Sequence, residues 1–577
     1  MYPYIKPHFT FFTILSFVLL TAQCSSPESL DVQLINEVKK EKADKTHIKQ
    51  LLTKGANVNY EDIEQNTALH WAAINGHIEF VTLLLDAGAD INHLNKYRLT
   101  PLVNAIKNEH PTLALRLIDA GAGINISSDN TDNPIFYAVD RGYIKLVELL
   151  VSKGADLNII IGRIYTPLLI AVEHDDLKMV ETLLSLNADI NQVAEITALC
   201  MAARQNNKIL VELLLSKGAS IDLSGRIGIT PLFAAAYNGH LEVMCTLIDA
   251  GADINKIDKL EETPLYHAVS ENQVEVVALL LEMGADVLVE CKAEKRTVLL
   301  HAAEKGHDQI IDMLIMYKSP INKDDLFERT PLFVAAQNNH LTSVQLLLQK
   351  GADINKSNMN EEAPLFAAAI NGHQDIVEYL HQSGAPIDVP NRAKETPLYA
   401  ALKAGHDSTA RYLIQAGANV NFQDIQKETP LYLAVYNSNL EMVKILLAAG
   451  ADIEKDFAYN QPLIHIAASN GNVEIVEQLI DAGANINTSE KYMNNTTLHS
   501  AIFSANLEMV KYLVEAKVDV NQKNHDGRTA LHFACLSKQI EMVEYLLAAG
   551  ADPSIKDVVG DKAVDLTQDT SIKDLFE

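Results

Sequence analysis

Histidine is the residue type whose spacing first suggests chemistry in this chain of 577 residues. Imidazole binds metal ions and gains a proton near neutral pH, so regularly spaced histidines could bind metal or relay protons. If successive copies of one segment pack side by side, equivalent atoms lie about 10 Å apart. Zinc ligands lie only about 2 Å from the ion, so we interpret these histidines as turn residues. They are His307, His340, His373 and His406, at intervals of 33 residues, with His77, His110 and His240 in the same setting.

Other reactive residue types form no recognisable constellation. Acidic residues are plentiful, but no acidic pair stands out with a partner base. Phosphate-binding, nucleophile-elbow, zinc-protease, dinucleotide and calcium-loop motifs do not occur. We therefore predict no catalytic site, no metal site and no cofactor, and we expect a protein that is not an enzyme. The cysteines are also isolated, without metal-type or C-x-x-C spacing: Cys24, Cys200, Cys245, Cys291 and Cys535.

The formal net charge of −28 limits the possible partners. Nucleic-acid binding requires an excess of Lys and Arg, so we expect no nucleic-acid partner. The acidic charge also disfavours charge-driven binding to a membrane surface. Two interpretations remain, solubility through self-repulsion or a preference for basic partners. Hydrophobic residues make up 48% of the chain and charged residues 21%, which suffices for a sizeable buried core.

One segment returns along nearly the whole chain. Thr67 opens its first clear copy and Thr529 its last good one, and the 462 residues between them contain 14 intervals with a mean of 33. A second signature, G-A-D-I-N, recurs in phase with the first. A register held over so many copies indicates a repeat architecture. Examples of the two signatures are T-P-L at 100–102, 230–232, 330–332 and 429–431, and G-A-D-I-N at 88–92, 251–255 and 351–355.

The repeated residues have the properties that helix ends require. Thr100 is a suitable N-cap because its hydroxyl can accept a hydrogen bond from a free backbone amide, and Pro101 fits the first helical position. Glycine allows a left-handed C-cap, and the Asp/Asn-rich stretch that follows turns the chain into the next unit. One unit cannot bury both its faces, so units must stack. The predicted C-caps are Gly76, Gly239, Gly306, Gly372 and Gly405 after first helices, and Gly88, Gly121 and Gly154 after second helices.

The period and the string T-P-L-H-x-A-A…G-H…L-L-L…G-A-D-x-N resemble the ankyrin repeat. The resemblance covers about residues 30–577. It implies an all-α solenoid of about 15 helix-turn-helix units, with degenerate caps and short hairpin-like loops. We predict a tether and amino-terminal capping repeat over 25–65, the repeat array over 66–560, and a carboxy-terminal cap over 561–577.

The resemblance also implies a function. Ankyrin proteins usually bind other proteins through their hairpin tips and the concave face of the first helices. We therefore expect a monomeric, non-catalytic scaffold with a protein partner. Aromatic residues and Arg are enriched at binding hot spots, although each candidate could equally be a half-buried packing residue. The candidates are Tyr97, Arg98, Arg163 and Tyr165 at the tips, and Trp71 and Tyr137 in first helices.

One position departs from the family pattern. The residue after T-P-L is His in ordinary ankyrin units, but here it is His only near the two ends. Interior units have aromatic residues instead, which indicates either packing between repeats or an exposed aromatic strip for a partner. The histidines are His70, His465, His499 and His532, and the aromatic residues are Phe233, Tyr266, Phe333, Phe366, Tyr399 and Tyr432.

Residues 1–24 differ from everything after them. Residues 9–20 form an apolar run, too short for a comfortable membrane-spanning helix, that fits the apolar region of a signal peptide. Residues 20–26 resemble a bacterial lipoprotein cleavage site, in which Cys24 would be lipidated and a Ser-rich tether would follow. The match is imperfect, so an ordinary signal peptide cleaved near Ala22 and an uncleaved anchor are the alternatives.

We accordingly expect an exported protein, located in the periplasm or cell envelope or else secreted. Contact with a membrane would come only through the N-terminal lipid or signal anchor. Two further functions remain as alternatives: a secreted effector that acts on proteins of another cell, and a non-catalytic subunit of an enzyme complex.

Overall fold

The computed structural model describes residues 28–126, 133–162, 164–291, 294–455 and 461–577. The chain divides into two compact units, Met1–Pro231 and Leu232–Glu577, which we describe separately. Among the described residues, no helix is long and apolar enough to cross a membrane.

The first unit contains a capping helix pair and five further helix pairs within its described residues. The capping pair lies in the segment predicted to be the amino-terminal capping repeat. The helices are α1 (Leu30–Val38), α2 (Lys45–Thr53), α3 (Ala68–Ile74), α4 (Ile78–Asp86), α5 (Pro101–Lys107), α6 (Pro111–Asp119), α7 (Pro134–Asp140), α8 (Ile144–Ser152), α9 (Pro167–Glu173), α10 (Leu177–Ser185), α11 (Ala198–Arg204) and α12 (Lys208–Ser216).

The described part of the second unit contains ten helix pairs, a two-stranded hairpin and three short terminal helices. The helix pairs are α13 (Pro231–Tyr237), α14 (Leu241–Asp249), α15 (Pro264–Ser270), α16 (Val274–Glu282), α17 (Val298–Lys305), α18 (Asp308–Met316), α19 (Pro331–Gln337), α20 (Leu341–Gln349), α21 (Pro364–Ile370), α22 (Gln374–Gln382), α23 (Pro397–Lys403), α24 (Asp407–Gln415), α25 (Pro430–Tyr436), α26 (Leu440–Ala448), α27 (Leu463–Asn470), α28 (Val473–Asp481), α29 (Thr497–Phe503), α30 (Leu507–Glu515), α31 (Ala530–Leu536) and α32 (Ile540–Ala548). Strands β1 (Glu290–Cys291) and β2 (Arg296–Thr297) pair antiparallel, and the terminal helices are η2 (Ala563–Leu566), α33 (Thr570–Lys573) and η3 (Asp574–Phe576).

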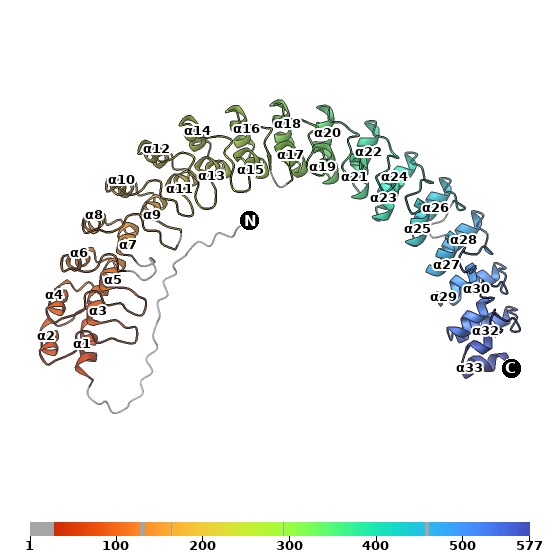
Figure 1. The fold of residues 1–577 in the computed structure, drawn as a ribbon, viewed down its shortest axis with the longest axis horizontal. Helices are drawn as coiled ribbons and strands as arrows, with labels where there is room; N and C mark the ends of the chain where they lie inside the picture. The colour runs from red at the N-terminus through yellow and green to blue at the C-terminus, as the bar shows by residue number, and fades with distance from the viewer. Residues whose placement is uncertain (1–27, 127–132, 163, 292–293, 456–460) are drawn as a thin grey trace. The chain divides into compact units, whose positions relative to one another are not determined.

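Within each unit the helices form two layers (Figure 1). First helices of successive pairs pack against one another, as α3 does against α5 and α19 against α21. The second helices pack against one another in the same way, as α4 does against α6. The predicted all-α solenoid of helix-turn-helix units is thereby confirmed.

The predicted helix caps are present. The Thr100 hydroxyl accepts a hydrogen bond from the Val103 amide at 3.3 Å, and Pro101 is the first residue of α5. The glycines proposed as C-caps all have positive φ, for example 73° at Gly306 and 89° at Gly88. The local sequence therefore specifies where each helix begins and ends.

The position after T-P-L is filled by buried side chains. The six interior aromatic residues there are at most 8% exposed, which confirms packing between repeats and excludes an exposed aromatic strip at this position. His70 is buried as well: its Nδ1 accepts a hydrogen bond from the Thr67 amide at 3.2 Å, and its Nε2 donates to the carbonyl oxygen of Leu99 at 3.0 Å. The six aromatic residues and His70 thus link one repeat to the next by packing or by a hydrogen bond.

Three of the regularly spaced turn histidines contact the preceding repeat. The Nε2 atoms of His110, His340 and His373 each lie 3.0 Å from the carbonyl oxygen 36 residues earlier, at the end of the preceding first helix. These contacts join neighbouring repeats and confirm the interpretation of these histidines as turn residues.

A ladder of asparagines joins the loops that follow the second helices. In the first unit, Asn59 donates to the carbonyl oxygen of Gly88 at 3.1 Å and accepts from the amide of Asp90 at 2.8 Å. In the second unit, Asn421 makes the equivalent bonds to Gly450 and Asp452 at 3.0 and 2.8 Å. At these joints the Asn of the G-A-D-x-N signature, or of its variant at 55–59, therefore binds the backbone of the repeat that follows it.

Burial makes the terminal histidines a source of pH dependence. Desolvation lowers the pKa of His70, His465 and His499 to about 4 from the ordinary value of 6.5, although hydrogen bonds to backbone carbonyls oppose the shift. Between these two values the unfolded chain binds more protons than the folded chain. The stabilising contribution of each neutral histidine is therefore full above pH 6.5 and is lost as the pH falls toward 4.

We predict that His499→Phe weakens this pH dependence, because phenylalanine occupies the same position in other repeats and cannot gain a proton. Between pH 7 and pH 5 the variant should lose about 1–2 kcal/mol less stability than the wild type. Urea unfolding at both pH values measures the difference. His525→Phe, which replaces an exposed histidine, is the control and should behave as the wild type does. An equal pH dependence for His499→Phe and the wild type would contradict the prediction.

Burial should also make two cysteines unreactive. Cys200 and Cys535 are at most 1% exposed, and burial raises the pKa of each thiol to about 12. Thiolate is the reactive form, so iodoacetamide should modify Cys245, which is half-buried, well before either of them. Peptide mass mapping after native labelling measures the order, and denatured protein provides the control. Equal native rates at all three cysteines would show that the repeats open locally.

Candidate protein-binding surface

Many of the hairpins before the first helices are built around an Asp or Asn. The backbone amide of Asn95 donates to the carbonyl oxygen of Leu99. The side-chain Oδ1 of Asn95 accepts from the backbone amides of Tyr97 and Leu99 at 3.0 and 2.9 Å. The third residue of the tip, Arg98, has φ of 62°. This arrangement fixes the three tip residues 96–98 without help from a regular strand. We use the name hairpin tip for these three positions in each repeat.

Neighbouring hairpins are also joined through their main chains. The amide of Lys96 donates to the carbonyl oxygen of Glu64 at 2.9 Å in the first unit. In the second unit, the amide of Leu326 donates to Glu294 and that of Ile425 to Ala393. Within each unit, tips joined in this way form a row whose backbone geometry is set before any partner arrives.

Large apolar side chains are exposed along this row. Ile63 is 95% exposed and Leu260 is 67% exposed, although nothing in the repeat pattern requires an apolar residue at either position. Scattered exposed apolar residues are ordinary, but repetition at one structural position in both units is not. The other exposed apolar tip residues of the described chain are Tyr97, Ile164, Val193, Ile227, Leu326, Phe327, Met359, Ile425, Tyr492, Met493, Val558 and Val559.

Two of the predicted binding residues lie side by side at one tip. Tyr97 is 54% exposed, and its hydroxyl donates to Glu64 Oε1 of the preceding hairpin at 3.3 Å. The neighbouring carboxylate raises the pKa of the Tyr97 hydroxyl. Arg98 is exposed beside it. Both side chains are accessible to a partner.

Trp71, predicted in a first helix, belongs to a half-buried cluster. Its Nε1 donates to Asp62 Oδ2 at 2.9 Å, and Lys39 Nζ lies 4.4 Å from its ring centroid and 3.0 Å from the same carboxylate oxygen. Burial acts to raise the pKa of Asp62, but hydrogen bonds from Lys39, Trp71 and the hairpin amides outweigh it and hold the pKa below 3.8. The indole is therefore held in one orientation with part of its surface accessible.

The remaining predicted residues are distributed over separate repeats. Tyr137 is half-buried in α7, with Lys107 Nζ 5.6 Å from its ring centroid. Tyr165 is half-buried before α9, and its hydroxyl lies 3.5 Å from Glu173 Oε1. Burial of the hydroxyl raises the pKa of Tyr165, and the negative charge of Glu173 raises it further. Arg163 and Cys24 lie outside the described residues.

Charged side chains of two successive hairpins in the second unit are paired with one another. Arg329 contacts Asp325 at 2.6 Å and Glu294 at 3.2 Å, and Arg296 contacts Glu294 at 2.5 Å. These ion pairs connect two successive hairpins. They add to the order of the tips rather than leaving free charges for a ligand.

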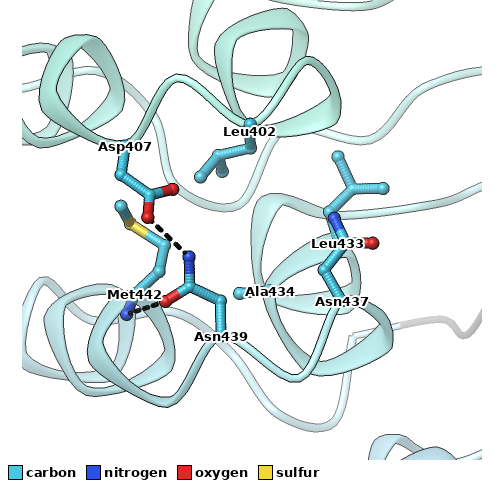
Figure 2. Close-up of a pocket in the computed structure, with 8 residues that line it drawn as sticks. Leu402, Asp407, Leu433, Ala434, Asn437, Asn439 and Met442 are labelled. Atoms are coloured by element: carbon cyan, nitrogen blue, oxygen red, sulfur yellow. Dashed lines mark hydrogen bonds between the residues drawn. The ribbon is translucent and has the colours of Figure 1, made fainter.

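A hollow of about 310 Å³ lies between the turns that follow α23 and α25 (Figure 2). Asn439 occupies the position from which His340 and His373 reach the preceding repeat. The shorter Asn439 side chain binds Asp407 Oδ2 at 2.8 Å and accepts from the Met442 amide at 3.1 Å. The hollow is therefore the space that a histidine fills elsewhere, and we assign it no ligand. It is lined by Leu402, Gly405, Asp407, Leu433, Ala434, Asn437, Asn439 and Met442.

Stacked helix pairs with an ordered row of hairpin tips define a helical repeat protein. The family model of ankyrin repeats (3 copies) matches residues 38–128, 102–194, 168–258, 199–291, 287–358, 365–457 and 464–557. These matches span most of the chain, which therefore belongs to the ankyrin-repeat family. Ankyrin repeats are in general scaffolds for protein–protein interaction.

Comparison with individual proteins adds little to this assignment. No curated protein matches the chain. Among solved structures, the chain is similar to the ankyrin repeat domain of Bcl-3, described as a unique member of the IkappaB protein family. The two are 26% identical over 37% of this chain and 97% of that chain, with a TM-score of 0.34.

The residues that position the candidate side chains were not identified from the sequence. Asp62 and Glu64 orient Trp71 and Tyr97, yet each is an acidic residue among many in an acidic chain. The available signal was the recurrence of Asp or Asn five residues before the helix-capping Thr. That recurrence predicts a hairpin, but it does not indicate which carboxylate also reaches an aromatic side chain.

Substitution of Asp62 tests the Trp71 cluster. Asp62→Asn keeps an acceptor for the hairpin amides, as Asn95 does, but its amide nitrogen cannot accept from the indole. Trp71 is the sole tryptophan of the chain, so its fluorescence reports the cluster directly. We expect a longer emission wavelength and stronger acrylamide quenching in Asp62→Asn. Asp62→Ala should in addition lower the free energy of unfolding by about 1–3 kcal/mol. Unchanged emission in Asp62→Asn would show that the carboxylate does not hold the indole.

Proposed function

We propose that this chain is a non-catalytic scaffold that binds another protein through its hairpin tips and the adjoining face of the first helices. The observation that carries the proposal is the row of exposed apolar side chains on tips whose backbone is fixed by hydrogen bonds. A preordered surface loses little conformational entropy when a partner binds. More of the free energy gained by burying its apolar area therefore remains as binding affinity.

Particular side chains are suited to anchor such a partner. Tyr97 and Arg98 present an aromatic ring and a guanidinium group at one tip, and Trp71 presents an oriented indole beside the neighbouring hairpin. These residue types supply a large share of the binding energy at most interfaces. The acidic net charge favours a partner with a basic surface, because complementary charge speeds encounter and suppresses wrong partners.

The proposed location is outside the cytoplasm. Its basis is the segment 1–24, which resembles a signal peptide with Cys24 at a lipoprotein-type cleavage site. An exported scaffold of this kind would hold its partner in the periplasm or at the cell envelope. The alternatives are a secreted effector and a non-catalytic subunit of an enzyme complex.

Co-purification with matched variants tests the binding surface. The mature chain is used to capture partners from its own cells, and the partners are identified by mass spectrometry. The tip variant combines Ile63→Ser, Tyr97→Ser and Leu260→Ser. The control combines Ile209→Ser and Met316→Ser, which replace exposed apolar residues of the second helices. We expect the control to retain a partner that the tip variant loses, with affinity reduced at least tenfold for purified components. Equal retention by both variants would contradict the proposal.

Fractionation tests the location separately. We expect the chain in the membrane fraction with a lipid on Cys24, and Cys24→Ala in the soluble exported fraction. Unchanged membrane association of Cys24→Ala would contradict lipidation, and release of wild-type protein into the medium would favour the secreted effector. Turnover by the purified chain that one substitution abolishes would overturn the scaffold proposal itself.

A further inference from the structure

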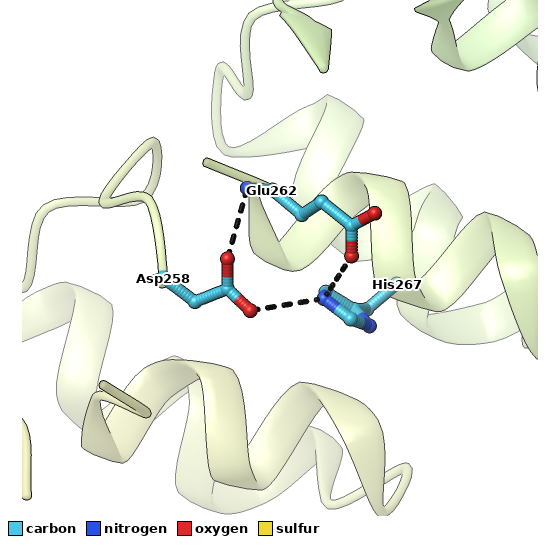
Figure 3. A group of neighbouring side chains, drawn as sticks. All are labelled: Asp258, Glu262 and His267. Carbon is cyan, nitrogen blue, oxygen red and sulfur yellow. Dashed lines mark hydrogen bonds and ion pairs between the residues drawn. The ribbon is translucent and has the colours of Figure 1, made fainter. Parts of the chain in front are cut away.

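Three potential metal ligands converge at the start of α15 in the second unit (Figure 3). Asp258 and Glu262 lie in the hairpin before the helix, and His267 lies four residues after the helix-capping Thr263. His267 Nε2 is 2.8 Å from Glu262 Oε2 and 3.5 Å from Asp258 Oδ2. The three ligand atoms all lie within 4.8 Å of one another.

The two carboxylates are held in place by the hairpin. The Asp258 amide donates to the carbonyl oxygen of Glu262 at 3.0 Å, which closes the turn. Asp258 Oδ1 accepts from the amides of Leu260 and Glu262 at 2.8 and 3.0 Å. The second oxygen, Oδ2, is thereby directed to His267. Such backbone support for one carboxylate oxygen is typical of the shell around metal ligands.

The imidazole is held from a second direction. The Phe233 ring packs edge-on against His267, with 4.2 Å between the ring centroids. Only 19% of the His267 side chain is exposed, against 9% for Asp258 and 20% for Glu262. The cluster is therefore ordered and largely sheltered, with some solvent access left.

The geometry around His267 Nε2 differs from that of a hydrogen bond. This nitrogen is buried and forms no hydrogen bond, although two carboxylate oxygens lie close to it. Neither oxygen lies along the direction in which an N–H group would point. If a metal ion were bound to the nitrogen along that direction, its other ligand atoms would lie to the side of the nitrogen–metal line. Those atoms would be about 3 Å from the nitrogen. The two oxygens lie at distances from the nitrogen that ligands of one shared ion would have.

Equivalent positions in other repeats lack at least one member of the trio. The next repeat has His301, but Arg296 stands in the position of Glu262 and pairs with Glu294 and Glu304. A later repeat has Asp424 and Glu428, but Leu433 stands in the position of His267. Within the described residues, only Asp258, Glu262 and His267 form such a group.

We propose that Asp258, Glu262 and His267 bind a divalent transition-metal ion, with zinc as the best match. One imidazole nitrogen and two carboxylate oxygens are ligands that zinc accepts at about 2.0–2.2 Å. The two carboxylates balance the double charge of the ion. A fourth position on the exposed side is left for water or for an acceptor group of a bound protein. The ion would tie the hairpin 258–262 to α15 and stiffen one part of the row of tips.

Zinc titration of the full chain, freed of metal by chelation, tests the proposal. Calorimetry should give one strong site. His267→Ala and Asp258→Asn should each lower zinc affinity at least tenfold. Both replacements occur naturally in equivalent positions, as Ala234 and Ala367 and as Asn358 and Asn391, so the repeat tolerates them. Asp424→Asn is the matched control, because Asp424 accepts the same two hairpin amides but lies in a repeat with no equivalent of His267.

Cobalt provides a second measurement that does not depend on affinity alone. Bound Co²⁺ should give a visible absorption band typical of low coordination number, and the band should be absent in His267→Ala and present in Asp424→Asn. Zinc should raise the melting temperature of the wild type and leave that of His267→Ala unchanged. Equal zinc binding by the wild type, His267→Ala and Asp258→Asn would overturn the proposal, as would binding lost to the same extent in Asp424→Asn. None of these outcomes depends on a protein partner.

Discussion

A single helix pair of this chain has apolar side chains on more faces than it can cover by itself. Leu102 and Ile106 of α5 are fully buried only because α3 and α7 pack on either side of that helix. The same relation holds for Leu365 and Phe366 of α21 between α19 and α23 in the second unit. The stability of each repeat is therefore set mainly by its two neighbours. Every other feature of the molecule depends on this constraint, because hairpins and turns acquire a fixed position only after the helices have stacked.

Stacking also explains how short loops can present side chains in an ordered way. Hairpins such as 95–99 contain only five residues and would be flexible in isolation. In hairpin 95–99 a side-chain acceptor fixes the turn, and a main-chain hydrogen bond joins it to the previous hairpin. The helices supply rigidity and the tips supply variation. That separation allows binding chemistry to change at the tips without a change in the buried layers.

The sequence allowed the helices to be predicted closely, because their signals are local. Thr100, Pro101 and Gly88 each act within a few residues, through a cap, a fixed backbone angle or a left-handed turn. Burial of the aromatic residues after T-P-L was less certain from the sequence. A tyrosine such as Tyr399 can pack inward or point outward, and only the neighbouring helices determine which.

Contacts between repeats set the limit of sequence reasoning. Trp71 was identified as a candidate, but its partners Asp62 and Lys39 come from a hairpin and from the capping helix pair. The grouping of Asp258, Glu262 and His267 likewise depends on a hairpin folding back toward the next helix. No motif spacing marks it, because the same acidic positions recur in repeats that lack the histidine.

The asparagine ladder has a consequence for how such an array can change over generations. Asn59 and Asn421 contact only main-chain atoms of the following repeat, so they place no demand on its side chains. Any unit with the same backbone course and a free backbone amide at that position satisfies them; a proline there, such as Pro386, cannot donate that bond. Gene segments that encode whole units can therefore be duplicated, deleted or exchanged while this set of bonds re-forms. The asparagine bonds between repeats therefore place little limit on the number of units. A stronger limit is the need for a capping unit with a polar outer face at each end.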